Sequence, residues 1–239
     1  QSETHNFVVI RHTKAISDEV KAVVIKACTP YKYSVIWQSE SDVIDHTNIT
    51  MPYYYLDEFK LKFEFGLDNF IQVNAQVNQA MLKQSVDWLG LSGNENILDL
   101  FCGIGNFSLV LAKQAKTVIG IEGVASAVAM AAQNAQTNSI SNAQFHCFDL
   151  TQKIQNAQWF NKNLDVLVLD PSRTGAMAIL EQLPLKQFKT ILYVSCDPVT
   201  LARDSAIISQ AGFELNKIGL MNMFPHTGHI ETMALFPRR

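Results

Sequence analysis

The stretch from Ile97 to Phe107, ILDLFCGIGNF, constrains the fold more than any other part of the chain. Its apolar run ends in a turn that contains Gly103 and Gly105, and a new apolar face begins at Leu109. This order predicts a buried strand, a tight loop and a helix. The glycines let a ligand approach the backbone, and the start of the helix presents unpaired N–H groups. The stretch therefore predicts a ligand site at the end of a strand.

The next strand narrows the choice of ligand. The predicted strand at residues 117–121 is followed by Glu122, whose carboxylate can accept hydrogen bonds from both hydroxyls of a ribose. A dinucleotide fingerprint needs a third glycine where this chain has Ser108, which disfavours a hydride-transferring dehydrogenase. Asp99, before the loop, is badly placed for a pyrophosphate and well placed for a cationic ligand. S-adenosylmethionine, with a ribose, an ammonium and no phosphate, fits this pattern better.

From residue 97 onward the chain alternates predicted strands and helices. We expect strands at 97–100, 117–121, 144–148, 165–169, 190–195 and 232–236. Such alternation predicts an α/β fold with a mostly parallel, doubly wound sheet and ligands at the carboxyl ends of the strands. Polar residues lie near these ends or just before the last strand: Asp99, Glu122, Asp149, Asp170, Cys196 and Glu231.

The first part of the chain has a different pattern. Residues 7–10 and 33–37 are predicted strands, and a helix between them is capped by Ser17 and stopped by Pro30. This β-α-β piece is small, so we expect it to complete a domain within a longer chain. Residues 42–52 are predicted to be irregular, residues 61–65 form another strand, and the next helix carries an apolar stripe of Val77, Met81, Val86 and Leu89.

Composition limits the classes of protein and of site. The 239 residues are 48% hydrophobic and 17% charged, with a net charge of −3, so any contact with nucleic acid must be local. No apolar run is long enough to span a bilayer. The four cysteines have no C-x-x-C spacing, and His226 and His229 lack a third ligand nearby, so no metal site is predicted. A reducing cytoplasm is the expected compartment.

Five motifs occur in order: FIQVNA, DLFCGIGNF, the DPSR turn at 170–173, VSCDPVTLARD and MFPHTGHIE. Together they resemble the RNA (uracil-5-)-methyltransferases, and their wording is most similar to the members that act on 23S ribosomal RNA. The resemblance implies a Rossmann-like S-adenosylmethionine-dependent methyltransferase domain at 58–239. It also implies that residues 1–57 are part of a small central α+β domain.

The resemblance also implies roles for individual residues. Cys196 matches the nucleophile that adds to carbon 6 of uracil, and Glu231 matches the base that removes the carbon-5 proton. The cofactor-binding pattern falls on Gln72, Phe101, Asn106, Glu122, Asp149 and Asp170. The other cysteines, Cys28, Cys147 and for the most part Cys102, are interpreted as small buried hydrophobic residues.

The resemblance implies a ribosomal RNA substrate whose target base is flipped out or single-stranded, a monomer and no membrane partner. The members most similar to this chain carry an upstream RNA-binding barrel and an iron–sulfur cluster, whose ligands are not in this sequence. Transfer RNA or another ribosomal uridine, an amino-methyltransferase and a non-catalytic RNA-binding module remain alternatives. Arg173 and Arg203 are either phosphate contacts or structural ion pairs, and Phe70 and Phe224 either stack on a base or pack in the core.

Overall fold

The structure is a computed structural model that describes residues 6–39, 51–154, 157, 159–160, 163–228 and 230–239. The chain divides into two compact units, Gln1–Asn69 and Phe70–Arg239. The domain boundary predicted from the sequence, between residues 57 and 58, falls inside a β-hairpin whose two strands both lie in the first unit. That boundary stays a prediction for the whole protein.

The first unit contains two small sheets. Strands β1 (Asn6–His12) and β2 (Tyr33–Ser39) pair in parallel, and helix α1 (Asp18–Cys28) connects them, followed by the 3₁₀ turn η1 (Thr29–Tyr31). Ser17 caps α1 as predicted, because its hydroxyl accepts from the N–H of Val20. Strands β3 (Tyr53–Leu56) and β4 (Leu61–Glu64) form an antiparallel hairpin, of which only β4 was predicted. Most of the stretch predicted to be irregular lies outside the described residues.

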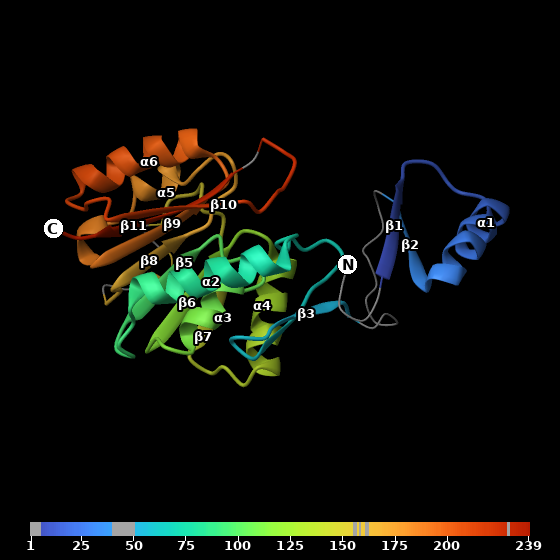
Figure 1. The fold of residues 1–239 in the computed structure, drawn as a ribbon, viewed down its shortest axis with the longest axis horizontal. Helices are drawn as coiled ribbons and strands as arrows, with labels where there is room; N and C mark the ends of the chain where they lie inside the picture. Colours follow the sequence, from blue (N-terminus) through green and yellow to red (C-terminus); the bar gives the residue numbers. More distant parts are fainter. Residues whose placement is uncertain (1–5, 40–50, 155–156, 158, 161–162, 229) are drawn as a thin grey trace. The chain divides into compact units, whose positions relative to one another are not determined.

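The second unit is built on a seven-stranded sheet in the order β10-β11-β9-β8-β5-β6-β7 (Figure 1). The strands are β5 (Asn96–Leu100), β6 (Thr117–Glu122), β7 (Ala143–Cys147), β8 (Val166–Leu169), β9 (Thr190–Ser195), β10 (Lys217–Met221) and β11 (Glu231–Pro237). Strands β5 to β9 are parallel, whereas β11 runs antiparallel between β9 and β10. The predicted α/β fold with a mostly parallel sheet is therefore confirmed.

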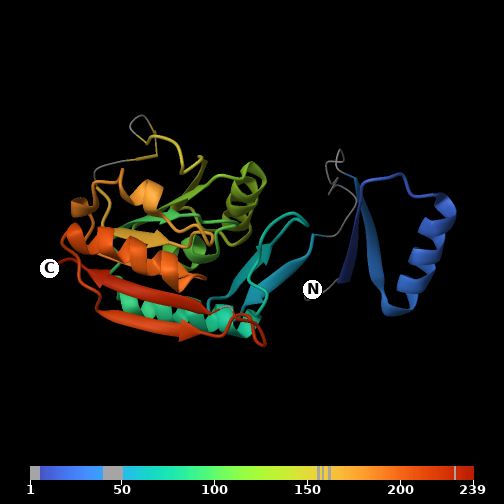
Figure 2. The ribbon, with the colours of Figure 1, turned by 90° about the horizontal axis from the view of Figure 1, so that it is seen from above.

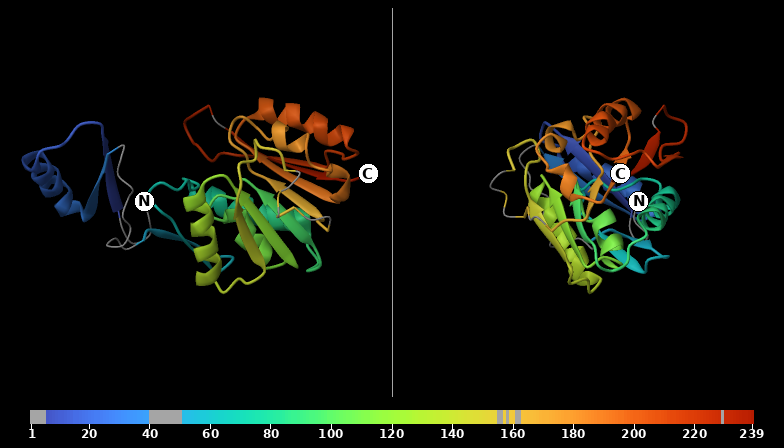
Figure 3. Two further views of the ribbon diagram at one scale, coloured as in Figure 1. Left: turned by 180° about the vertical axis from the view of Figure 1, so that it is seen from behind. Right: turned by 90° about the vertical axis from the view of Figure 1, so that its left-hand side faces the viewer.

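Helices cover both faces of this sheet. Helices α2 (Ala75–Leu89), α3 (Asn106–Ala112) and α4 (Ala125–Thr137) lie on one face. The short α5 (Met177–Leu180), the turn η2 (Leu185–Gln187) and α6 (Pro198–Gln210) lie on the other side (Figure 2). The view from behind shows α4 packed beside β7 (Figure 3). Because both faces are covered, the strands β8 and β9 are almost continuously apolar.

The six predicted strands of the second unit are present, and no strand end is shifted by more than one residue. The edge strand β10 was missed, since its sequence KIGLM is short and contains Gly219, and a glycine weakens the strand signal. In α2 the fully buried face is Asn78, Met81, Leu82 and Ser85, while Val77 and Val86 are half-buried. The packed face of α2 therefore includes two polar residues, Asn78 and Ser85, and the predicted apolar stripe covers only part of that face.

Candidate active site at the carboxyl edge of the sheet

The glycine turn between β5 and α3 has an unusual backbone. Phe101 has a φ of +65°, a strained conformation for a bulky residue and one that is typical of functional sites. Gly103 and Gly105 also have positive φ, +54° and +92°. A Cβ on Gly105 would press against Leu109, at 3.3 Å, whereas a Cβ on Gly103 would meet nothing within 4 Å. The turn therefore leaves open space above Gly103.

Glu122, at the end of β6, holds this turn from the neighbouring strand. Its Oε2 accepts from the N–H of Gly103 at 3.2 Å, and its Oε1 accepts from the N–H of Val124 at 2.9 Å. On the other face of the turn, the buried Asn134 of α4 donates its amide to the carbonyl of Ile104 at 3.3 Å. The backbone of the turn is thus fixed by side chains from two elements.

Asp99 is placed differently from what the sequence predicted. The side chain is fully buried, and its Oδ2 accepts from the Ser108 hydroxyl at 2.5 Å. Its Oδ1 has no hydrogen-bond partner among the described residues. Burial, reinforced by the charge of Glu122, raises the pKa of Asp99 to about 7. Asp99 is therefore shielded from direct contact with solvent, and Ser108 bonds Asp99 where a dinucleotide fingerprint has a glycine.

Asn106 is the first residue of α3, and it forms a reciprocal amide pair with Asn78 of α2. Each side chain donates to the other, at 2.8 and 3.1 Å, which ties the start of α3 to α2. Asn78 was not predicted from the sequence, where it resembles an ordinary polar helix residue. Gln72 lies just before α2, and its Oε1 is buried without a hydrogen-bond partner among the described residues. A buried, unpaired acceptor of this kind is expected where a ligand supplies the donor.

Asp149 follows β7 and is exposed. Its carboxylate accepts from both the N–H and the hydroxyl of Thr151, at 2.9 and 2.7 Å, and from Gln152 at 3.3 Å. These bonds lower the pKa of Asp149, so the group is ionised over the physiological range. It is an acceptor held in one orientation at the carboxyl edge.

Cys196 lies in the turn between β9 and α6. The Ser195 hydroxyl donates to the carbonyl of Asp197 at 2.9 Å and accepts from the N–H of the same residue at 3.1 Å. The Asp197 carboxylate caps α6, and Pro198 occupies the first position of the helix. On the neighbouring antiparallel strand β11, Thr232 pairs with Ser195 of β9. Glu231 precedes Thr232 and Cys196 follows Ser195, so both lie beyond this pair in the same direction. The register thus brings the thiol and the Glu231 carboxylate to the same end of the sheet.

Four ionisable groups meet around this turn. Burial raises the pKa of the Cys196 thiol, the charges of Glu231 and Asp170 raise it further, and Arg173 lowers it. Burial also raises the pKa of Glu231, which is almost fully buried. The pKa of Asp170 is raised well above its usual value by burial and by the charges of Glu231 and Asp99. The charges of these carboxyl groups thus act on one another, Glu122 on Asp99 and both Asp99 and Glu231 on Asp170, and a cationic ligand would favour their ionised forms.

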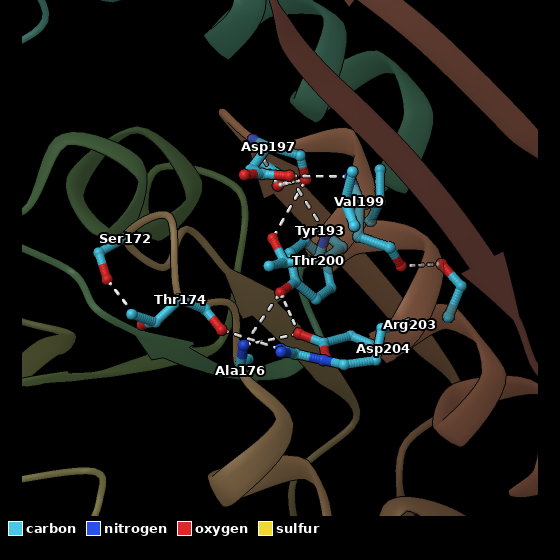
Figure 4. A network of polar contacts seen from close by, with 12 residues as sticks. Ser172, Thr174, Ala176, Tyr193, Asp197, Val199, Thr200, Arg203 and Asp204 are labelled. Carbon is cyan, nitrogen blue, oxygen red and sulfur yellow. Dashed lines mark hydrogen bonds and ion pairs between the residues drawn. The ribbon is translucent and has the colours of Figure 1, made fainter.

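A second polar cluster lies behind the DPSR turn (Figure 4). Asp204 of α6 is fully buried, and its Oδ2 accepts from the Tyr193 hydroxyl and from the N–H of Ala176, both at 2.6 Å. Arg203 forms an ion pair with Asp204 at 2.7 Å and donates to the carbonyl of Thr174 at 2.9 Å. The ion-pair interpretation of Arg203 is therefore the one that the structure supports.

Other predicted residues have mixed outcomes. Phe70 is 72% exposed, which excludes core packing, while Phe224 is half-buried. The prediction of buried cysteines holds for Cys102 and is wrong for Cys147, which is exposed, and for Cys28, which is half-buried. His226 is exposed, with a φ of +64°, and His229 lies outside the described residues.

Among the residues that the structure describes, no group of three or more His, Cys, Asp or Glu side chains is arranged to hold a metal ion. The described helices include none long and apolar enough to cross a membrane. The arrangement fits a small cationic nucleoside: open space over Gly103, a buried acceptor on Gln72 that has no partner among the described residues, and the interacting carboxyl groups. S-adenosylmethionine has the hydroxyls, the ammonium and the sulfonium charge that these features match.

Residues 14–239 match the model of the tRNA (uracil-5-)-methyltransferase family. A protein of Pseudoalteromonas translucida named 23S rRNA (uracil(1939)-C(5))-methyltransferase RlmD is 77% identical over the whole chain and over 54% of its own length. A Shewanella halifaxensis protein of the same name is 44% identical over 99% of the chain and 53% of its own length. The chain thus spans about half the length of the curated relatives that it matches.

Solved structures show the same fold. The tRNA (uracil-54, C5)-methyltransferase of Pyrococcus abyssi, in complex with S-adenosyl-L-homocysteine, aligns over 98% of this chain and 57% of its own, with a TM-score of 0.74 and 23% identity. TYW2 of M. jannaschii, in complex with AdoMet, aligns over 82% of this chain and 90% of its own, with a TM-score of 0.57 and 18% identity. With the match of the family model over residues 14–239, the chain belongs to the tRNA (uracil-5-)-methyltransferase family.

Proposed function

We propose that this chain is the catalytic part of an enzyme that methylates carbon 5 of a uridine in 23S ribosomal RNA. The observation that carries the proposal is the grouping of Cys196 with Glu231, Asp170 and Arg173 at the sheet edge that also carries the glycine turn. The names of the 77% and 44% identical relatives support the substrate class. S-adenosylmethionine, when bound, supplies the methyl group as an electrophile attached to a sulfonium.

The chemistry explains why a thiol is needed. Carbon 5 of uracil is a poor nucleophile, and addition of the Cys196 thiolate to carbon 6 makes it the carbon of an enolate, which can attack a methyl group. Burial and the two carboxylates keep Cys196 protonated at rest, so its proton passes to Asp170 as attack proceeds, which leaves Glu231 ionised for the later step, and it returns to the sulfur when the adduct breaks down. Arg173 stabilises the thiolate that forms.

Glu231 completes the reaction. Once carbon 5 carries the methyl group, the Glu231 carboxylate removes the remaining proton from that carbon. The electrons of the broken C–H bond restore the double bond between carbons 5 and 6, and the bond from carbon 6 to the Cys196 sulfur breaks. Glu231 is suited to this role because burial raises its pKa and so makes its carboxylate a stronger base.

The cofactor site is proposed to lie on the glycine-turn side of the edge. Glu122 accepts from the ribose hydroxyls, Asp149 accepts from the adenine amino group, and Phe101 contacts the nucleoside. Gln72 and Asp170 face the charged, methionine end, where an acceptor with no partner among the described residues and a half-buried carboxyl group favour a cation. Asn106 holds the start of α3 at this site through its pair with Asn78.

The RNA substrate is expected to bind locally, because the chain has a net charge of −3 and no overall basic field. The target uridine must leave any base stack to reach the half-buried Cys196. We propose that the whole protein acts as a cytoplasmic monomer. We also propose that an RNA-binding barrel and an iron–sulfur cluster lie outside these 239 residues. The 239-residue chain is then expected to bind cofactor and to recognise RNA more weakly than the whole protein.

RNA that contains 5-fluorouridine tests the proposal, because fluorine at carbon 5 cannot be removed as a proton and the adduct with Cys196 is trapped. We expect the wild-type protein to form this adduct on a 23S RNA transcript, and Cys196→Ala to form none while retaining cofactor affinity within about twofold. Cys147→Ala, at an exposed cysteine of the same unit, is the matched control and should behave as wild type.

The outcomes separate the alternatives. An adduct on a transfer RNA transcript and none on 23S RNA would move the proposal to the transfer RNA substrate. Methylation without any adduct would favour an amino-methyltransferase, in which no cysteine attacks the base. Calorimetry that detects RNA binding and no binding of S-adenosylmethionine would favour a non-catalytic RNA-binding module. Equal loss of adduct and cofactor binding in Cys196→Ala would contradict the nucleophile assignment.

A further inference from the structure

The buried cluster around Asp204 lies outside the residues that the proposed reaction uses, and it joins two loops that do take part. Asp204 is a fully buried carboxylate in the middle of α6. Its two oxygens accept from three different elements: Tyr193 of β9, the backbone N–H of Ala176, and Arg203 of α6. A buried charge with this many partners is costly to disturb, because any partner that is removed leaves a polar group unpaired.

Arg203 extends the cluster to the loop that follows β8. It bonds Asp204 through Nε, at 2.8 Å, and through Nη2, while the same Nη2 donates to the carbonyl of Thr174. Within this loop the N–H of Gly175 donates to the carbonyl of Ser172 at 2.9 Å, so residues 172–175 form a closed turn. The loop between Arg173 and α5 is thus bonded to α6 at two backbone positions, Thr174 and Ala176.

Gly175 shows how closely the loop and α6 approach. Its φ is +76°, and a Cβ built there would lie 2.5 Å from Nη2 of Arg203 and 2.6 Å from Oδ2 of Asp204. Neither contact is possible without moving the ion pair, which is held by its other bonds. Only glycine fits between the loop and this pair of side chains.

The same cluster is connected to the turn that carries Cys196. Tyr193 lies two residues before Ser195 on β9 and is fully buried. At the other end of the turn, Asp197 caps α6 through the N–H groups of Val199 and Thr200, as Figure 4 shows. The strand before Cys196 and the helix after it therefore both contact the cluster that holds the 172–176 loop.

We infer that Tyr193, Arg203 and Asp204 form a clamp that positions the 170–173 turn, with Asp170 and Arg173, against Cys196. The inference rests on the proposed function and adds positioning residues to it. None of the three reacts with the substrate. The clamp sets the position of a guanidinium and a carboxylate relative to the sulfur, and small displacements of reacting groups reduce rates strongly.

A pair of glycine substitutions tests the clamp. Gly175→Ala inserts a Cβ into it, whereas Gly212→Ala introduces similar backbone strain, at a φ of +98°, where a Cβ meets nothing within 4 Å. Both are made in the full-length protein and compared at equal folded fraction. We expect Gly175→Ala to lower kcat on a 23S RNA transcript by about 10- to 100-fold, with the Kd for S-adenosylmethionine within about twofold of wild type. Gly212→Ala should retain kcat.

A second pair of variants keeps the clamp testable if Gly175→Ala does not fold. Tyr193→Phe removes only the hydroxyl, which donates to Asp204 and accepts from the N–H of Ala176 at 3.1 Å. Ser205→Ala removes a hydroxyl on α6 that donates to the carbonyl of Leu201 at 2.7 Å. We expect Tyr193→Phe to slow trapping of 5-fluorouridine RNA about 3- to 10-fold and Ser205→Ala to leave it unchanged. If the cluster had only a structural role, the trapping rate would fall together with the melting temperature, and by the same factor in Tyr193→Phe and Ser205→Ala.

The outcomes are distinct. If Gly175→Ala and Tyr193→Phe keep the rates of their controls, the clamp does not position the site and the inference is overturned. If they lose cofactor affinity as much as kcat, the cluster supports the whole unit and the inference is again overturned. A wild-type protein that forms no adduct overturns the proposed function and the inference together.

Discussion

At the glycine turn, polar side chains hold backbone: Glu122 accepts from the N–H of Gly103, and Asn134 donates to the carbonyl of Ile104. Around Cys196, ionisable side chains interact with one another. Glu231, Asp170 and Arg173 all shift the pKa of the thiol. The two regions share one edge of one sheet, yet the first is shaped by hydrogen bonds and the second by interactions between ionisable groups.

The difference has a functional consequence. A turn whose backbone is held by hydrogen bonds presents its donors and acceptors in fixed positions, which suits a site that only has to bind. The carboxyl groups of Asp170 and Glu231, half-buried and buried, have raised pKa values, which suits a site where protons must move. Asp99 links the two, because its charge acts on Asp170 and it interacts with Glu122.

The largest expected effect is in the region around Cys196. Glu231→Gln removes the base that takes the carbon-5 proton, so turnover on a 23S RNA transcript should fall by roughly 10²- to 10⁴-fold. Because the thiol can still attack and accept a methyl group on carbon 5, a methylated protein–RNA adduct should accumulate. A labelled methyl group followed on a denaturing gel measures it. The control is Glu214→Gln, at an exposed glutamate of the same unit. Rapid turnover by Glu231→Gln would exclude it as the base.

The next effect concerns Asp99, between the two regions. Its folded-state pKa of about 7 lies above the unfolded value, so the folded state binds the proton more tightly. Its contribution to stability is complete below about pH 4 and is lost as pH rises toward 7. Asp99→Asn should remove this loss, which amounts to at most about 1.4 kcal/mol per pH unit.

Urea unfolding between pH 4 and pH 8 measures this difference from wild type. Asp165→Asn is the control of opposite sign, because bonds from Asn96 and Lys189 lower the pKa of Asp165. The stability that Asp165 contributes is present above about pH 4 and is lost as pH falls below it. Parallel stability curves for Asp99→Asn and wild type would show that Asp99 does not titrate between its normal value and 7.

The two regions also differ in how well the sequence predicted them. The glycine turn depends on neighbours in the chain: Gly103 and Gly105 lie within one loop, and Glu122 ends the next strand. Local pattern is sufficient for such a site, and it predicted the strand, the loop and the helix. It did not predict that Asp99 is buried against Ser108, because that bond depends on how α3 packs on β5.

The region around Cys196 depends on contacts between distant residues. The pairing of β11 with β9 brings Glu231 to Cys196, and neither residue has a local signal apart from the family motifs. Tyr193 and Asp204 resemble a core aromatic and a surface carboxylate in the sequence, and Ala176 contributes only a backbone N–H. Edge strand β10 was missed for a related reason, since its pairing with β11 compensates for a weak local signal.

A moderate effect is expected on the backbone-bonded side. Glu122→Gln keeps the shape of the side chain but loses its charge, and one amide half then faces an N–H donor of Gly103 or Val124. We expect the Kd for S-adenosylmethionine to rise about tenfold in calorimetry, with kcat at saturating cofactor nearly unchanged. Glu95→Gln is the matched control, because Glu95 also accepts from backbone N–H groups, at the opposite end of β5. Equal affinity in the two variants would remove Glu122 from the cofactor site.

The smallest effect tests whether burial decides the strength of a contact on this side. Asp149 is exposed, so water competes for any bond that it makes, and we expect Asp149→Ala to raise the cofactor Kd by about threefold or less. Thr151→Ala keeps the carboxylate and removes only the hydroxyl that orients it, so its Kd should stay closer to wild type. The same titrations measure both. A loss in Asp149→Ala as large as that in Glu122→Gln would mean that cofactor binding buries Asp149, and that the open end of the site closes around the ligand.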